Sequence, residues 1–224
     1  MDGHENCTIE PYPRVRQLTV DGGWLNARRH NVHGLLEMDV TRARRLIRQH
    51  RQRTGEALSF TAFMIACLAR AMGDNPHIHA CRDWRGRLVM FKDVNVNTMF
   101  EARVQGQATV VSHIVKAADK KSVRKIHEEI RSVQQRHSTG QGGSEAGDIK
   151  RFVMLPAFVR RLFYWYLYRK PALLHDRFGT VSMTAVGMFG KGGGWAIPFG
   201  NHTLSAALGG IAEKPGVVQG KIVA

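Results

Sequence analysis

The segment 179–190 constrains the fold more than any other part of the chain. Its sequence, Gly-Thr-Val-Ser-Met-Thr-Ala-Val-Gly-Met-Phe-Gly, alternates apolar residues with the hydroxyl-bearing Ser182 and Thr184. A period of two predicts a β-strand with both hydroxyls on one face, and the glycines that follow predict a turn. Because a hydroxyl on a buried strand face needs a hydrogen-bond partner, the pattern is typical of a functional site. It is also what an ordinary sheet strand beside a tight turn would show, since threonine is a good strand former.

Hydrophobic periodicity and capping residues predict the neighbouring elements. Ser59 and Ser122 each precede an apolar stripe at helical spacing, and Thr41 precedes a third. Each hydroxyl is expected to cap the helix that follows it. The helix over 58–73 should pack on the sheet, and a further helix is expected over 152–168. Strands are predicted at 33–40, 88–91, 94–100, 108–114, 179–186 and 203–212.

The length of the chain, 224 residues, favours one domain with a well-buried core. Residues 1–29 contain two prolines and an Asp-Gly-Gly sequence, so they are expected to form a loosely structured N-terminal arm. The domain itself is expected to span 30–224. Within it, the segment 138–148 is rich in glycine, serine and glutamine, which predicts a flexible loop.

Three ordered blocks resemble one enzyme family. The segment 58–71 with the turn Asn-Pro-His-Ile-His-Ala at 75–80 forms the first block, and Val-Asn-Val-Asn-Thr at 94–98 with Ala-Ala-Asp-Lys-Lys-Ser at 117–122 forms the second. The third runs from Gly179 to Gly216. These blocks are similar to the helix, the P-x-x-N-A turn, the A-D-x-K-S/T segment and the G-T-x-T-x-S-x-x-G-x-x-G strand of 2-oxoacid dehydrogenase acyltransferase (E2) catalytic domains. The resemblance covers roughly residues 30 to 224.

The resemblance implies a fold, a reaction and an assembly. The fold would be α/β (α+β), a chloramphenicol acetyltransferase-like mixed sheet flanked by helices and C-terminally incomplete. The reaction would be acyl transfer between a thioester, such as acyl-CoA, and an acceptor thiol. Coenzyme A would act as acyl donor or acceptor, with no metal and no lipoyl group on this chain. The family also implies a homotrimer.

Alignment on the family motifs assigns the site residues. Thr184 falls on the serine whose hydroxyl binds the oxyanion, and His79 falls on the asparagine of the turn. Ser182, His79 and Gly187 are expected to contribute to substrate binding. Family enzymes take their general base from a C-terminal H-x-x-x-D-G motif, which is absent from these 224 residues. The chain as given is therefore expected to have little activity; the alternative is a non-catalytic relative that binds an acyl or CoA ligand or a partner.

Composition leaves one alternative from a different class open. The net charge of +15 would attract polyanions such as membranes or nucleic acid, although arginines along a helix are often only a solvated face. No nucleic-acid recognition motif accompanies the charge, so specific nucleic-acid binding is not expected. The aromatic, basic segment 152–170 resembles an interfacial membrane helix, or a helix packed on the sheet or on a neighbouring subunit. Three separated cysteines without a C-x-x-C motif indicate reduced thiols in a cytoplasmic protein, with no disulfide scaffold and no zinc site.

Overall fold

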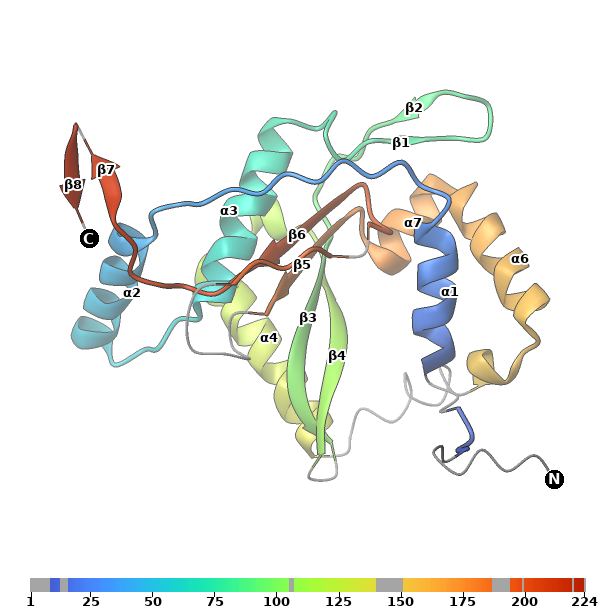
Figure 1. The fold of residues 1–224 in the computed structure, drawn as a ribbon, viewed down its shortest axis with the longest axis horizontal. Helices are drawn as coiled ribbons and strands as arrows, with labels where there is room; N and C mark the ends of the chain where they lie inside the picture. Colours follow the sequence, from blue (N-terminus) through green and yellow to red (C-terminus); the bar gives the residue numbers. More distant parts are fainter. Residues whose placement is uncertain are drawn as a thin grey trace.

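A mixed four-stranded sheet with strand order β4-β3-β5-β6 forms the centre of the molecule (Figure 1). In this computed structural model, the antiparallel pair β3 (Val96–Val104) and β4 (Gln107–Val115) forms one half of the sheet. Strand β5 (Val181–Ala185) runs parallel to β3 on one side and to β6 (Leu204–Leu208) on the other. The structure describes residues 9–12, 16–104, 107–139, 151–186, 194–198, 200–218 and 220–223.

Two helices, α3 (Phe60–Asp74) and α4 (Val123–Ser138), cover one face of the sheet (Figure 1). The Ser59 hydroxyl accepts a hydrogen bond from the amide of Ala62, and the Ser122 hydroxyl accepts one from the amide of Lys125, so both predicted caps are confirmed. The apolar stripes of the two helices pack on the apolar side of the strands. The fully buried part of this core includes Ala62, Ile65, Ala69, Ile126, Val96, Val181 and Met183.

The remaining elements surround this core. The chain leads from β3 and β4 through the short η2 (Ala118–Lys120) into α4, and a small β1–β2 hairpin precedes β3. On one side of the sheet, α1 lies beside α6, while α2 and the β7–β8 hairpin lie at the opposite end of the molecule (Figure 1). The bounds are α1 Gln17–Asn26, α2 Thr41–Thr54, β1 Cys81–Arg82, β2 Leu88–Val89, α6 Ala157–Tyr168, α7 Pro171–Phe178, β7 Gly216–Val218 and β8 Lys221–Val223.

The sequence-based elements of the core are confirmed. The segments predicted as strands at 179–186 and 203–212 contain β5 and β6, which are hydrogen-bonded neighbours in one sheet. The helix predicted over 58–73 is α3, and its residues belong to the same core cluster as the strands. The predicted mixed sheet flanked by helices is therefore present. Residues 140–150, which include most of the loop expected at 138–148, lie outside the described residues.

Two expectations for the N-terminal part are wrong. Residues expected to form a loose arm contain the helix α1, because Asp21 forms a buried ion pair with Arg160, far away in sequence. The segment 33–40 is not a strand: no sheet partner pairs with it among the described residues, and Leu36 is 78% exposed. An alternating sequence forms a strand only where a neighbouring strand completes its hydrogen bonds.

The predicted cap at Thr41 is also wrong. Thr41 is the first residue of α2, and Val40 occupies the capping position without a side-chain hydrogen bond. The Asp39 carboxylate instead accepts a hydrogen bond from the Thr41 amide at 2.8 Å, which satisfies one of the free amides of the first turn. The aspartate two residues earlier therefore takes the place of the threonine hydroxyl.

Gly179 fixes the position at which β5 enters the sheet. Its φ of 72° and ψ of 162° lie in a region that only glycine adopts readily. A Cβ at this position would lie 2.6 Å from the Asn95 carbonyl oxygen and 3.3 Å from the Asn97 amide nitrogen. The absence of a side chain therefore allows the chain to pass directly beside the backbone that leads into β3.

We expect Gly179→Ala to lower the free energy of unfolding by about 3 kcal/mol or more, because strain and a backbone clash act together. Urea unfolding measures this change. The matched control is Gly23→Ala, at a helical position of α1 where a Cβ would meet no atom within 4 Å. This control should stabilise the protein by about 0.5–1 kcal/mol. Equal effects of the two substitutions would show that the close approach at Gly179 is not a constraint.

Candidate active site

A row of polar side chains crosses the sheet on the face opposite α3 and α4. Asn97 on β3, Ser182 on β5 and Ser205 on β6 are successive partners in the strand register. The Ser182 hydroxyl donates to the Ser205 hydroxyl at 2.9 Å, and the Ser112 hydroxyl of β4 donates to Asn97 Oδ1 at 2.7 Å. We call Ser112, Asn97, Ser182 and Ser205 the polar row. It extends over all four strands, and both Ser182 and Asn97 are buried.

Thr184 lies on the same face, one pair further along β5. Its cross-strand partners are Met99 and Ala207, and its side chain is partly buried. Within the described part of the chain its hydroxyl makes no hydrogen bond, whereas the Ser182 hydroxyl is bonded to Ser205. The alternation in the sequence thus placed both hydroxyls on one face as expected. The structure distinguishes them: the Ser182 hydroxyl is bonded to Ser205, whereas the Thr184 hydroxyl has no hydrogen-bond partner among the described residues.

His202 joins the polar row from the loop before β6. Its Nε2 lies 3.2 Å from the carbonyl oxygen of Phe178 and 3.4 Å from Asn97 Nδ2. A single tautomer satisfies only one of these contacts, because Nε2 must carry a proton to donate to the carbonyl and a free lone pair to accept from the amide. Burial lowers the pKa of His202 to about 4, so the ring is neutral near pH 7.

His79 lies at the other end of β5. It is buried, and its Nδ1 is 3.3 Å from the hydroxyl of Thr180, which directly precedes the strand. Burial is the main reason that the pKa of His79 is lowered. The ring lies near Phe91, which in turn stacks on the His175 ring at a centroid distance of 4.2 Å. His79 therefore contacts Thr180, whereas Ser182 and Thr184 lie further along the strand.

A cavity of about 330 Å³ opens beside His79. Cationic and anionic side chains both line it, so it has no uniform charge. The lining residues are Arg70, Gly73, Asp74, His79, Phe91, Lys92, Asp93, Val94 and Asp119. This cavity contains neither hydroxyl of the predicted strand motif. It therefore gives no support to a single binding pocket shared by His79 and Thr184.

Some expectations cannot be placed in the structure. Gly187, expected to contribute to substrate binding, lies outside the described residues. Among the residues that are described, no group of three or more histidine, cysteine, aspartate or glutamate side chains is arranged to hold a metal ion. In the same part of the chain, no helix has both the length and the apolar character needed to cross a bilayer.

Sequence reasoning missed Ser205, Ser112 and His202 as neighbours of the strand motif. No motif in its own segment marks any of the three, and only the folded arrangement of the strands brings them together. Asn97 carried a visible signal, because it belongs to the polar side of an alternating segment at 94–100. The partners of that polar side depend on register, which a single sequence does not reveal.

Comparison with known proteins identifies the family to which this chain belongs. The family model of the 2-oxoacid dehydrogenases acyltransferase catalytic domain matches residues 28–146. The chain belongs to this family, as its motifs indicated. No curated protein gives a significant match to the sequence.

Solved structures show the same fold at low sequence identity. A probable dihydrolipoamide acetyltransferase of Listeria monocytogenes 4b F2365 is 16% identical, with a TM-score of 0.68 over 98% of this chain and 81% of that one. The dihydrolipoamide acetyltransferase of Azotobacter vinelandii is 14% identical, with a TM-score of 0.68 over 99% and 80%. A truncated catalytic core of the 2-oxoacid dehydrogenase multienzyme complex from Thermoplasma acidophilum is 17% identical, with a TM-score of 0.64 over 93% and 82%.

The low pKa of His202 predicts a specific loss of stability in acid. The unfolded chain takes up this proton near the ordinary histidine pKa of about 6.5, whereas the folded chain takes it up only near 4. Since the unfolded state binds more protons between these values, stability falls as the pH drops through that window. At pH 5 the contribution of His202 amounts to a loss of roughly 2 kcal/mol relative to pH 7.

We expect His202→Gln, which keeps a donor for the Phe178 carbonyl, to remove this part of the acid sensitivity. Urea unfolding at pH 7 and pH 5 measures it as the difference between variant and parent. His33→Gln, at an exposed position, controls for the change of residue type. If His202→Gln and the parent lose the same free energy of unfolding between the two pH values, His202 is not buried as the neutral form.

Proposed function

We propose that this chain is an acyltransferase that moves an acyl group between a thioester and a thiol, with coenzyme A as the acyl carrier. The family membership supports the reaction class. The observation that carries the residue assignment is the Thr184 hydroxyl, which is partly buried on the polar face and makes no hydrogen bond within the described residues. A donor of this kind can bind an oxyanion without first breaking another hydrogen bond.

In the proposed step, the sulfur of the acceptor thiolate attacks the carbonyl carbon of the thioester. The carbonyl oxygen becomes an oxyanion, and the Thr184 hydroxyl donates a hydrogen bond to it. Collapse of the tetrahedral intermediate breaks the bond from carbon to the sulfur of coenzyme A, whose thiolate leaves and takes a proton from solvent. The Azotobacter vinelandii relative was investigated for the role of a serine, a histidine and an asparagine in its catalytic mechanism.

The proton of the acceptor thiol needs a base, and we assign none among these 224 residues. They contain no H-x-x-x-D-G motif. His202 is a poor candidate, because its pKa of about 4 makes it a weak base at neutral pH and its Nε2 is engaged with the polar row. The thiol must then ionise by itself, so the rate of transfer by residues 1–224 depends on the fraction of thiolate in solution.

Ser182 and His79 have positioning roles in this proposal. The Ser182 hydroxyl donates a hydrogen bond to Ser205, which links β5 to β6 two residues before Thr184. His79 contacts the Thr180 hydroxyl and fixes the start of the strand. Gly187 remains a proposed contributor to substrate binding. A homotrimer is part of the proposal as well, since relatives form the core of multienzyme complexes. The second candidate function is binding of an acyl-CoA ligand without turnover.

We expect Thr184→Val to lower the rate of thioester exchange by roughly 10²–10³, because it preserves shape and removes the oxyanion donor. The assay uses residues 1–224 with acetyl-CoA and a dithiol at pH 9, where much of the acceptor is already thiolate. Thr184→Ser keeps the hydroxyl and should remain within about threefold of the parent. The apparent KM for acetyl-CoA should not change, because the lost interaction forms only in the transition state.

Ser182→Ala is the matched control, since it removes the other hydroxyl on the same face. It should cost less than Thr184→Val. If Ser182→Ala abolishes exchange while Thr184→Val stays within about threefold, Ser182 is the oxyanion donor. A rate that levels off near neutral pH would reveal a base within the chain. Binding of acetyl-CoA without exchange at pH 9 would identify the non-catalytic relative.

A further inference from the structure

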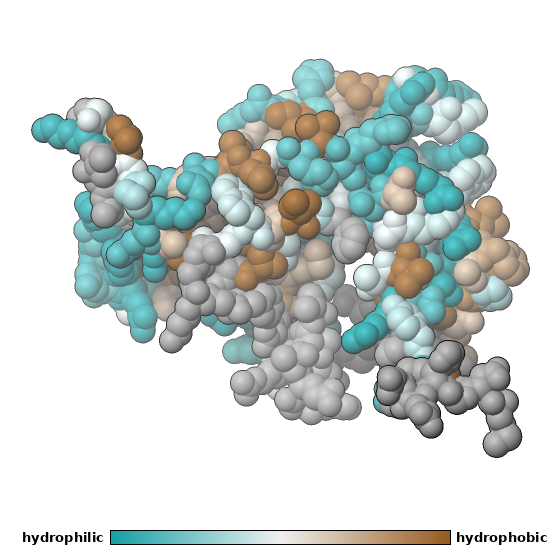
Figure 2. All heavy atoms as spheres, in the orientation of Figure 1, coloured by the Kyte–Doolittle hydropathy of each residue, from teal (hydrophilic) through white to brown (hydrophobic). Residues whose placement is uncertain are grey.

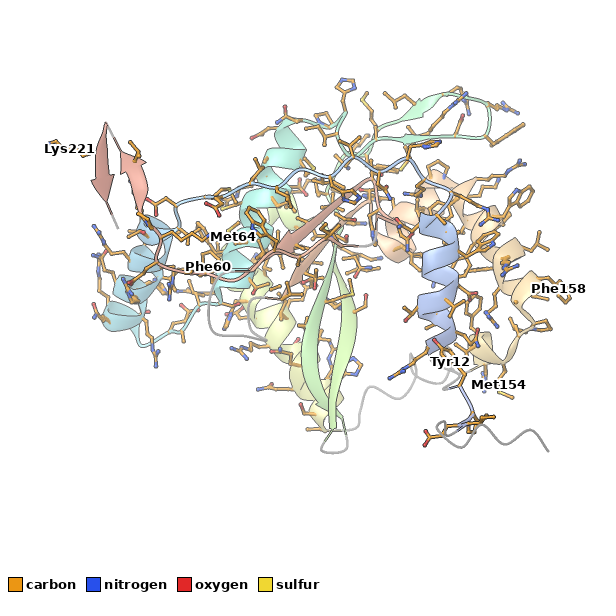
Figure 3. The ribbon with its side chains drawn as sticks, in the orientation of Figure 1. Tyr12, Phe60, Met64, Met154, Phe158 and Lys221 are labelled. Carbon is orange, nitrogen blue, oxygen red and sulfur yellow. The ribbon has the colours of Figure 1, made fainter. Side chains whose placement is uncertain are left out.

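The outward side of α6 is apolar, which is unusual for a surface helix. Phe158, Leu162 and Trp165 follow one another at helical spacing and are 72%, 61% and 50% exposed. Figure 2 shows hydrophobic side chains gathered over α6 at the edge of the molecule, and in Figure 3 the labelled Phe158 points away from the body of the protein. Met154, in the short helical segment before α6, is 68% exposed as well.

The inward side of α6 is fixed by a buried ion pair. Arg160 Nε lies 2.6 Å from Asp21 Oδ2, and Arg160 Nη2 lies 3.3 Å from Asp21 Oδ1, with both side chains almost fully buried. Leu167 is buried on the same side of the helix. Because Arg160 and Leu167 must face α1 and the body of the protein, the helix cannot rotate to hide its apolar stripe. The packing of α6 through Arg160 and Leu167 therefore keeps Phe158, Leu162 and Trp165 exposed.

Basic side chains accompany the apolar stripe. Arg161 and Arg169 are exposed at positions that border it, and the Arg169 guanidinium lies 3.9 Å from the centre of the Trp165 ring. The sequence from residue 151 to residue 175 contains no aspartate or glutamate. We define the α6 outer face by Phe158, Arg161, Leu162, Trp165 and Arg169. It combines an apolar stripe, an aromatic residue of the type found at membrane interfaces and two cations.

We propose that the α6 outer face binds the surface of an anionic lipid bilayer, with the helix lying parallel to the membrane plane. A bilayer offers the two environments that this face requires: an apolar phase for Phe158 and Leu162 and negative headgroups for Arg161 and Arg169. Nucleic acid would neutralise the arginines but has no apolar phase for the stripe. A second copy joined through this same face would bring the arginines of both copies together, because residues 151–175 contain no aspartate or glutamate to neutralise them.

The position of this surface separates it from the acyl-transfer site. The α6 outer face shares no residue with the polar row, and Thr184 lies on β5 in the central sheet, whereas α6 lies beside α1 at the edge of the molecule (Figure 1). The arginine-rich helix α2 lies at the opposite end of the molecule from α6 (Figure 1), so its positive charge does not belong to this face. The proposal does not depend on Thr184, and its outcome leaves the proposed function untouched.

The test is co-sedimentation of the protein with vesicles of phosphatidylcholine containing 30% phosphatidylglycerol, compared with pure phosphatidylcholine, at about 0.1 M salt. We expect binding to the anionic vesicles only, and its loss at high salt. Arg161→Gln with Arg169→Gln should weaken binding about 25-fold, or about fivefold for each arginine removed. Phe158→Ser with Leu162→Ser should weaken it about tenfold or more. The control, Arg44→Gln with Arg48→Gln on α2, removes equal charge elsewhere and should have a much smaller effect.

A second measurement reports the depth of the helix directly. Brominated lipid should quench part of the tryptophan fluorescence of the bound protein, and Trp165→Phe should remove that part. If the protein stays in solution with anionic vesicles, or if Phe158→Ser with Leu162→Ser binds like the parent, the proposal is wrong. Conversion of an oligomer into a smaller species by the same double variant, seen by sedimentation velocity without vesicle binding, would instead identify the face as a subunit interface.

Discussion

The passage of Gly179 beside the backbone of Asn95 determines the arrangement of the site. Because Gly179 has no side chain, the chain can pass close to the Asn95 backbone. Strand β5 can then begin between β3 and β6 and pair in parallel with both. Parallel pairing with these two neighbours sets the register that places Ser182 between Asn97 and Ser205. A shift of one residue would turn both hydroxyls of β5 into the apolar core. The polar row and the position of Thr184 therefore follow from a backbone contact that no side chain other than hydrogen permits.

Local signals in the sequence were sufficient to predict the part of the fold in which helices pack on the sheet. Ser59 and Ser122 were read as helix caps because each precedes an apolar stripe, and the same stripes pack on the sheet. The signals failed where the stabilising interaction is distant. Asp21 looked like part of an Asp-Gly-Gly turn, yet its partner Arg160 lies 139 residues away. A buried carboxylate needs such a partner, and the pair stabilises α1 at a place where its sequence is a poor helix former.

The same contrast between local signals and distant interactions applies to the candidate site. Alternation alone put Ser182 and Thr184 on one face, and this part required no structure. Distinguishing the two hydroxyls did require a structure, because the difference depends on their neighbours on β6. Ser182 pairs with Ser205, whereas Thr184 pairs with Ala207. His79 was assigned from a turn motif, and its observed partner is Thr180 at the opposite end of the strand. A motif gives the order of residues along the chain, but not which end of a strand faces a substrate.

In the proposed function, the polar row explains why a hydroxyl without a hydrogen bond to another described residue would be useful on this face. Buried polar groups that bond to one another are held rigid, and their hydrogen bonds are not open to a ligand. Ser182 and Asn97 are of this kind, since their partners are Ser205 and Ser112. Thr184 lies on the same strand as Ser182, so the hydrogen bonds of the polar row hold its position. Its own hydroxyl takes no part in those hydrogen bonds. Catalysis by an oxyanion donor requires this combination, because a donor that must be freed or reoriented during the reaction loses part of its stabilising effect.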